Sequence, residues 1–170
     1  MTKVFVGADH RGFGMKELIL GECSPGFVSG QSPSAIVDLS AEGFSFEDAG
    51  AFSEDPEDDF NGPARAVAKK VLDNPGTRGV LICGTGVGMS IQANRFPGVR
   101  AVLARSKKDA RLAREHNDAN ILCLGGDETD YDDAAEIIQV FLKTEFLGNE
   151  RYRRRNSELD VGFNIDKEDE

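Results

Sequence analysis

Short apolar runs alternate with stretches of helical periodicity along the chain. Four runs of five residues are mostly apolar and predict buried strands, and a fifth alternates apolar and polar residues as a half-buried strand does. In chain order, the predicted strands are 4–8, 44–48, 79–83, 100–104 and 120–124. The predicted helices are 12–22, 33–41, 63–72, 87–94, 107–116 and 131–143. This alternation predicts an α/β fold in which helices cover both faces of a parallel sheet.

The length and charge of the chain narrow its class. Its 170 residues predict a single domain over 1–160, followed by an acidic tail at 161–170 that we expect to be disordered. Asp and Glu number 30 against 20 Lys and Arg, a formal net charge of −10. Because binding to phosphate backbones or anionic lipids requires clustered cations, nucleic acid and a membrane surface are poor candidates as partners. No apolar run approaches the ~18 residues of a membrane span, and residues 1–7 lack the long apolar core of a secretory signal, so we expect neither a span nor a signal.

Cysteine usage points to a reducing compartment. Cys23, Cys83 and Cys123 are odd in number and widely spaced, which fits neither a disulfide framework nor a Cys-x-x-Cys zinc site. We therefore expect a cytoplasmic protein.

Ligands of open parallel sheets bind beyond the carboxyl ends of the strands, and this rule selects three segments. The first strand is followed by 9–12, Asp-His-Arg-Gly, and the third by 84–88, Gly-Thr-Gly-Val-Gly. The helix after the fourth strand ends at 114–118, Arg-Glu-His-Asn-Asp. We expect the functional side chains to come from these segments.

The glycine loop at 84–88 is open to two interpretations. It either exposes backbone N–H groups to an anionic ligand at a helix start or forms a tight structural turn. Its spacing matches neither the dinucleotide fingerprint nor the triphosphate loop. Cys83, at the end of the strand before it, is either a base or nucleophile whose thiolate the N–H groups favour, or an inert buried thiol. Cys123 lies inside a strand and is expected to be structural.

The two histidines and one arginine cluster complete the candidate chemistry. His10 and His116 both fall in the selected segments, and histidine is the natural proton carrier near neutral pH. Arg151 and Arg155 are four residues apart, so on a helix they share a face and can bind one anion, although a solubilising patch is the alternative. The acidic run 54–59 is expected to be a solvated loop.

Several of these segments match one protein family. The stretches GVLICGTGVGMSIQAN at 79–94, RFPGVRA at 95–101 and AREHNDAN at 113–120 closely resemble the type B ribose-5-phosphate isomerases, whose relatives include galactose-6-phosphate isomerase subunits. GADH at 7–10 resembles the N-terminal motif of the family, and RYRRR at 151–155 resembles its C-terminal arginine pair.

The resemblance implies a fold, an assembly and an activity. The fold is a Rossmann-like three-layer α/β/α sandwich with a five-stranded parallel sheet. The assembly is a homodimer, in some members a tetramer, with active sites at the dimer interface. The activity is aldose–ketose isomerisation of a sugar phosphate without a metal or other cofactor. For this chain the implied reaction interconverts ribose 5-phosphate and ribulose 5-phosphate through a cis-enediolate.

The resemblance also implies roles for individual residues. The base of the family is a cysteine at the position of Cys83 or a glutamate at the position of Met89, so this chain resembles the cysteine subgroup. The ring-opening histidine matches His116, and Thr85 with the loop N–H groups stabilises the oxyanion. The substrate-binding positions match Asp9, His10, Gly84, Gly86, Val87, Gly88, Asn117, Arg151 and Arg155.

The chain departs from the family pattern at several positions. Asp127 replaces an arginine that helps to bind phosphate, and should either repel a phosphate or change the local network. Tyr152 stands where histidine is frequent, Phe60 replaces a tyrosine near the sugar, and 23–32 resembles an insertion. These departures leave open the same reaction on a tetrose, hexose or deoxy sugar phosphate or on a sugar acid. A non-catalytic sugar-phosphate-binding subunit and a cysteine hydrolase or redox enzyme are the further alternatives.

Overall fold

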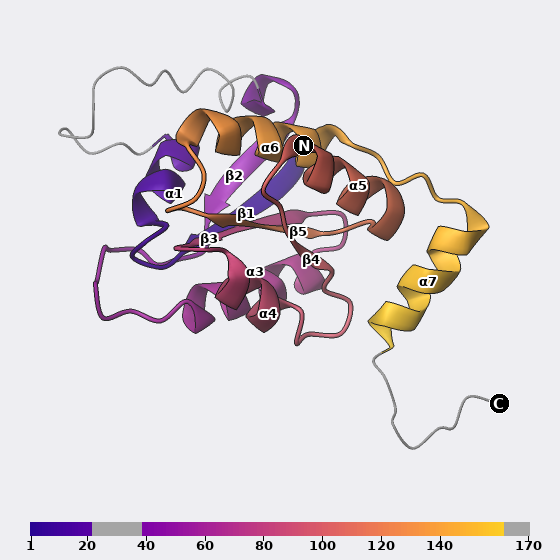
Figure 1. Ribbon diagram of the computed structural model, residues 1–170, viewed down its shortest axis with the longest axis horizontal. Coiled ribbons are helices and arrows are strands. Elements are labelled where there is room, and N and C mark those ends of the chain that lie inside the picture. Colours follow the sequence, from indigo (N-terminus) through magenta and orange to yellow (C-terminus); the bar gives the residue numbers. More distant parts are fainter. Residues whose placement is uncertain (22–38, 162–170) are drawn as a thin grey trace.

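The protein is a three-layer α/β/α sandwich (Figure 1). The computed structural model describes residues 1–21 and 39–161. Five parallel strands form one sheet in the order β2-β1-β3-β5-β4. The strands are β1 (Thr2–Ala8), β2 (Phe44–Asp48), β3 (Arg78–Cys83), β4 (Ala101–Leu103) and β5 (Ile121–Gly125). The predicted parallel sheet and the implied Rossmann-like class are confirmed.

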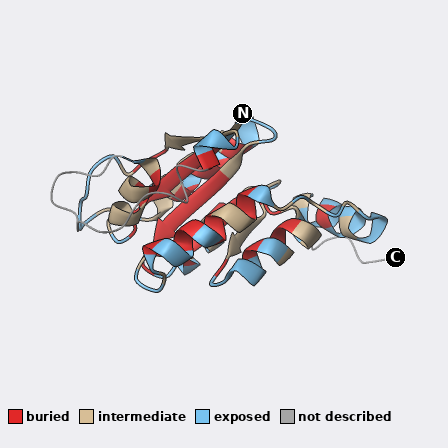
Figure 2. Ribbon diagram, turned by 90° about the horizontal axis from the view of Figure 1, so that it is seen from above, coloured by how far each residue is buried: buried red, intermediate tan, exposed pale blue. Residues whose placement is uncertain are grey.

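Helices cover both faces of the sheet, as the alternating pattern predicts. The helices are α1 (Phe13–Leu20), α3 (Asn61–Asp73), α4 (Val87–Ala93), α5 (Lys107–Asn117), α6 (Tyr131–Lys143) and α7 (Glu150–Asp160). One apolar cluster joins the sheet to α1, α5 and α6, and a second joins it to α3 and α4. Figure 2 shows the buried strands between these two helical layers.

Most predicted elements agree with the observed ones within two residues. The resembled insertion at 23–32 lies outside the described residues. Most of the predicted helix at 33–41 and all but the first residue of the predicted tail at 161–170 also lie outside them. The basic segment becomes the helix α7, whose first turn is capped by the Asn149 side chain accepting the Tyr152 N–H at 3.1 Å. Figures 1 and 2 show α7 extending beyond the sandwich, and it packs against α5.

The strand order places a topological switch point between β1 and β3. The chain leaves β1 toward β2 on one side, and from β3 it continues to β4 and β5 on the other. The register pairs Ala8 with Ile82 and Cys83 with Gly125, so β1, β3 and β5 end together. At such a point the connecting loops diverge and leave room for a ligand.

No helix among the described residues is long and apolar enough to cross a membrane.

Candidate active site

Cys83 lies at the carboxyl end of β3, where the glycine loop begins. Its side chain is buried on the α3–α4 face, and its Sγ accepts the Gly86 N–H at 3.2 Å. Gly86 has a left-handed φ of 73°, and a Cβ there would lie 2.9 Å from the backbone carbon of Leu124. The loop therefore needs glycine at this position, and its fold aims a backbone N–H at the sulfur.

The loop after β1 runs beside Cys83. The Asp9 N–H donates to the Ile82 carbonyl at 3.2 Å, and Asp9 Oδ1 accepts the N–H groups of Arg11 and Gly12 at 3.0 and 3.1 Å. A Cβ at Gly12 would collide with the Ile82 carbonyl, so only glycine lets the two loops approach this closely. Burial raises the pKa of the Asp9 carboxyl, although its two N–H donors favour the charged form.

His10 is held by a carboxylate from the acidic run. Its ring Nδ1 lies 2.8 Å from Asp58 Oδ1, which also accepts the His10 backbone N–H at 3.0 Å. This hydrogen bond raises the pKa of His10. The expectation that 54–59 is simply a solvated loop is therefore wrong at Asp58. The two residues are 48 apart in sequence, so no local pattern could have paired them.

Phe60 and Thr85 border the start of α4. A Cβ at Gly88 would lie 2.8 Å from the Phe60 ring, which therefore packs directly over this glycine. Thr85 is exposed, and its Oγ1 accepts the Val87 N–H at 3.4 Å. The Phe60 ring thus supplies an apolar cover over the glycine loop.

Asp127 does not stand as a free negative charge. It forms an ion pair with the Arg11 guanidinium, and its backbone N–H donates to the Gly84 carbonyl at 3.0 Å. Of the two outcomes expected for this departure, repulsion of a phosphate or a changed local network, the structure has the changed network.

His116 and the arginines of α7 form a second cluster. The His116 ring stacks on Tyr152 with 4.6 Å between centroids, and its carbonyl accepts the Asn156 side chain at 3.3 Å. The Arg151 guanidinium lies over the same Tyr152 ring, 5.2 Å from its centroid. Arg155 is exposed one turn further along α7.

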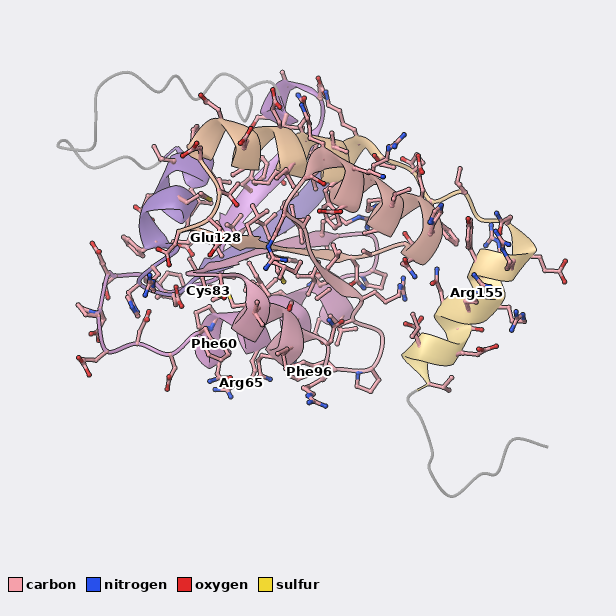
Figure 3. The ribbon with its side chains drawn as sticks, viewed as in Figure 1. Phe60, Arg65, Cys83, Phe96, Glu128 and Arg155 are labelled. Atoms are coloured by element: carbon pink, nitrogen blue, oxygen red, sulfur yellow. The ribbon has the colours of Figure 1, made fainter. Side chains whose placement is uncertain are left out.

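The two clusters lie on different sides of one chain. Helix α5 runs antiparallel to the strands, so His116 and Asn117 at its end lie at the amino edge of the sheet, whereas Cys83 lies at the carboxyl edge. The edges are separated by the length of β5, roughly 13 Å at 3.3 Å per residue. Figure 3 shows Arg155 and Cys83 far apart. The carboxyl-edge rule selected 114–118 along with the other two segments, but within one chain this segment is at the opposite edge.

Of the other two cysteines, Cys123 is structural and Cys23 lies outside the described residues. Cys123 is fully buried in β5, and burial raises the pKa of its thiol, which keeps it protonated and inert, as expected. In the part of the chain that the structure describes, no group of three His, Cys, Asp or Glu side chains is placed to hold a metal ion.

Fold and site together define an α/β protein with a thiol, a carboxylate and cations gathered at a topological switch point. The family model for ribose/galactose isomerases matches residues 4–159. Ribose-5-phosphate isomerase B of Mycolicibacterium paratuberculosis is 34% identical over 153 residues, which cover 90% of this chain and 86% of that protein. The chain belongs to the ribose/galactose isomerase family.

Solved structures of similar proteins agree with this assignment. The type B ribose 5-phosphate isomerase of Trypanosoma brucei superposes with a TM-score of 0.81 at 36% identity, covering 95% of this chain and 99% of that one. Ribose-5-phosphate isomerase B of Mycoplasma genitalium with bound ribulose-5-phosphate superposes with a TM-score of 0.77 at 34% identity, covering 92% of both chains.

Proposed function

We propose that this protein interconverts ribose 5-phosphate and ribulose 5-phosphate. The observation that carries the proposal is the position of Cys83, in a chain of this family, at the strand end beside Asp9 and His10. Support for the substrate comes from relatives named ribose-5-phosphate isomerase B, one of them solved with ribulose-5-phosphate. The feature that favoured a different sugar, Asp127 in place of an arginine, is paired with Arg11, which offsets its charge.

The proposed chemistry moves one proton between adjacent carbons. The Cys83 thiolate takes the proton from C2 of the open-chain aldose, the C1–C2 double bond forms, and the carbonyl electron pair moves onto O1. The thiol then returns the proton to C1 while the O2 proton passes to O1, which leaves the carbonyl at C2. The Gly86 N–H donates to the Cys83 Sγ, with 3.2 Å between nitrogen and sulfur, and so holds the sulfur at the end of β3.

Neighbouring groups support the developing charge and the substrate. Thr85 and the N–H groups of the glycine loop stabilise the enediolate oxygen, an effect of about 2.7–4 kcal/mol for a well-placed donor. Asp9 binds sugar hydroxyls, and His10, backed by Asp58, binds the phosphate. His116 opens the cyclic sugar by moving a proton between the ring oxygen and the anomeric hydroxyl.

We further propose that a complete site combines two copies of the chain. Arg155 lies far from Cys83 in one copy (Figure 3), Arg151 is on the same helix α7, and His116 is at the opposite edge of the sheet, so these side chains would reach substrate at the site of a partner. Val87 and Ile91 on α4, next to the glycine loop, are 40% and 55% exposed, as expected for side chains that a second copy covers. We therefore propose a homodimer, and place the enzyme in cytoplasmic carbohydrate metabolism because Cys83 and Cys123 are free thiols.

Two experiments test the proposal. Replacing the base in Cys83→Ala should lower kcat for ribose 5-phosphate by about 10²–10⁴-fold, whereas Cys123→Ala should leave kcat within about threefold. Unchanged turnover by Cys83→Ala would exclude the thiolate base.

The shared site is tested by mixing two inactive variants. In heterodimers of Cys83→Ala with Arg155→Ala, one site lacks both groups and the other has both. Random one-to-one mixing should therefore restore about a quarter of wild-type activity. No recovery would place both groups in a site within one chain.

A further inference from the structure

Arg11 and Asp127 form a bridge over the glycine loop. Their ion pair joins the loop after β1 to the loop after β5, on either side of β3. A Cβ at Gly84 would lie 2.7 Å from Asp127 Oδ2 and 2.8 Å from Arg11 Nε. The pair therefore rests on the residue that directly follows Cys83.

The Arg11 guanidinium retains donors for a ligand. Among the described residues, Asp127 is its one ion-pair or hydrogen-bond partner, and the Arg11 side chain is 58% exposed. A guanidinium presents five N–H donors in a planar fork, so one carboxylate leaves several of them free. The Arg11 side chain lies over Gly84, the residue that directly follows Cys83.

The Arg11–Asp127 ion pair resembles the His10–Asp58 pair. Each basic side chain pairs with a carboxylate from another loop, Asp58 with His10 and Asp127 with Arg11. The His10 and Arg11 side chains line one open hollow of about 370 Å³, which Cys83 does not line. Glu54 and Asp130 also line this hollow, so a bound anion needs His10 and Arg11 to offset two carboxylates.

We propose that Arg11 binds the phosphate group of the substrate together with His10, and that Asp127 is a positioning residue that holds the guanidinium over Gly84. This inference deepens the proposed function and rests on it. It assigns a role to Arg11, which the sequence motifs left unassigned, and it gives Asp127 a favourable role in spite of its charge.

A double-mutant cycle with ribose 5-phosphate separates these roles. Arg11→Ala should raise KM about tenfold with kcat within about threefold, because it removes a charge-assisted hydrogen bond to a part of the substrate that does not react. Inhibition by inorganic phosphate should weaken by a similar factor. Asp127→Ala should also raise KM, but should add nothing in the Arg11→Ala background, because it acts through Arg11. Lys69→Gln, which breaks the exposed pair with Asp73 on α3, is the matched control and should change neither constant.

Each outcome decides the inference. Unchanged KM and unchanged phosphate inhibition in Arg11→Ala, at a melting temperature equal to wild type, would overturn it. A lower KM in Asp127→Ala would show that Asp127 repels substrate and would overturn its positioning role. If Arg11→Ala is unstable, Arg11→Gln replaces it in the cycle. Calorimetric titration with ribose 5-phosphate measures binding without turnover. Binding that depends on Arg11, in a protein that does not isomerise the sugar, would refute the proposed function alone. The absence of binding to the wild-type protein would refute the inference.

Discussion

Replacing Gly86 by alanine tests whether the glycine loop is held against β5. The left-handed backbone at φ 73° costs an L-residue about 1–2 kcal/mol. The added Cβ would also lie 2.5 Å from a Leu103 methyl and 2.9 Å from the Leu124 backbone. The methyl can rotate away but the backbone cannot, so overpacking should add about 1–3 kcal/mol. The expected loss in the free energy of unfolding is about 2–5 kcal/mol.

Gly76→Ala is the matched control. Gly76 has a similar left-handed φ of 88°, but no atom lies within 4 Å of a Cβ placed there. Its expected cost is the backbone strain alone, about 1–2 kcal/mol. The difference between the two variants therefore isolates the contact of the loop with β5.

Urea denaturation at one fixed protein concentration measures both variants, because stability of an oligomer depends on concentration. Gly86→Ala should also lower kcat, since moving the loop takes the Gly86 N–H away from Cys83 Sγ. Equal destabilisation by the two variants would refute the argument that the β5 backbone braces this loop.

Three further changes have definite expectations. Because the hydrogen bond to Asp58 raises the pKa of His10, the stability it contributes is present below the ordinary value of 6.5 and lost as pH rises through the folded pKa; Asp58→Asn should return the pKa toward 6.5 in an NMR titration. Burial raises the pKa of Asp9, so the charged carboxyl lowers stability at neutral pH, and the Asp9→Asn variant should be at least as stable as wild type there. The gain should vanish as acid protonates Asp9, which urea midpoints at several pH values would measure. Arg100 donates to both Asp160 oxygens at 2.7 Å, so Arg100→Gln should speed amide exchange in α7 roughly two- to fivefold, the effect of a partly exposed ion pair; unchanged exchange would mean that the pair does not anchor α7.

Local patterns in the sequence were sufficient for the elements and for the first site cluster. Apolar runs and helical spacing predicted the five strands because burial on a sheet or helix face requires those periods. Asp9 and Cys83 were selected together because the carboxyl ends of parallel strands lie at one edge of the sheet, and the structure brings their loops into hydrogen-bond contact.

Contacts between distant segments could not be predicted in this way. The pairing of His10 with Asp58 and of Arg11 with Asp127 depends on loops that only the folded sheet brings together. Net charge gave no hint of these pairs, since it sums over the chain without regard to position. The sequence therefore predicted a solvated loop at 54–59 and left the effect of Asp127 open, whereas the folded loops pair Asp58 with His10 and Asp127 with Arg11.

The sequence by itself determined the parallel α/β sandwich, the glycine loop after Cys83 and the family. Only the tertiary structure decided that His116 and Arg155 lie at a different edge of the chain from Cys83. The physical reason is that periodicity and turn residues act over a few neighbours, whereas the relative position of two helix ends depends on how every strand and helix between them packs.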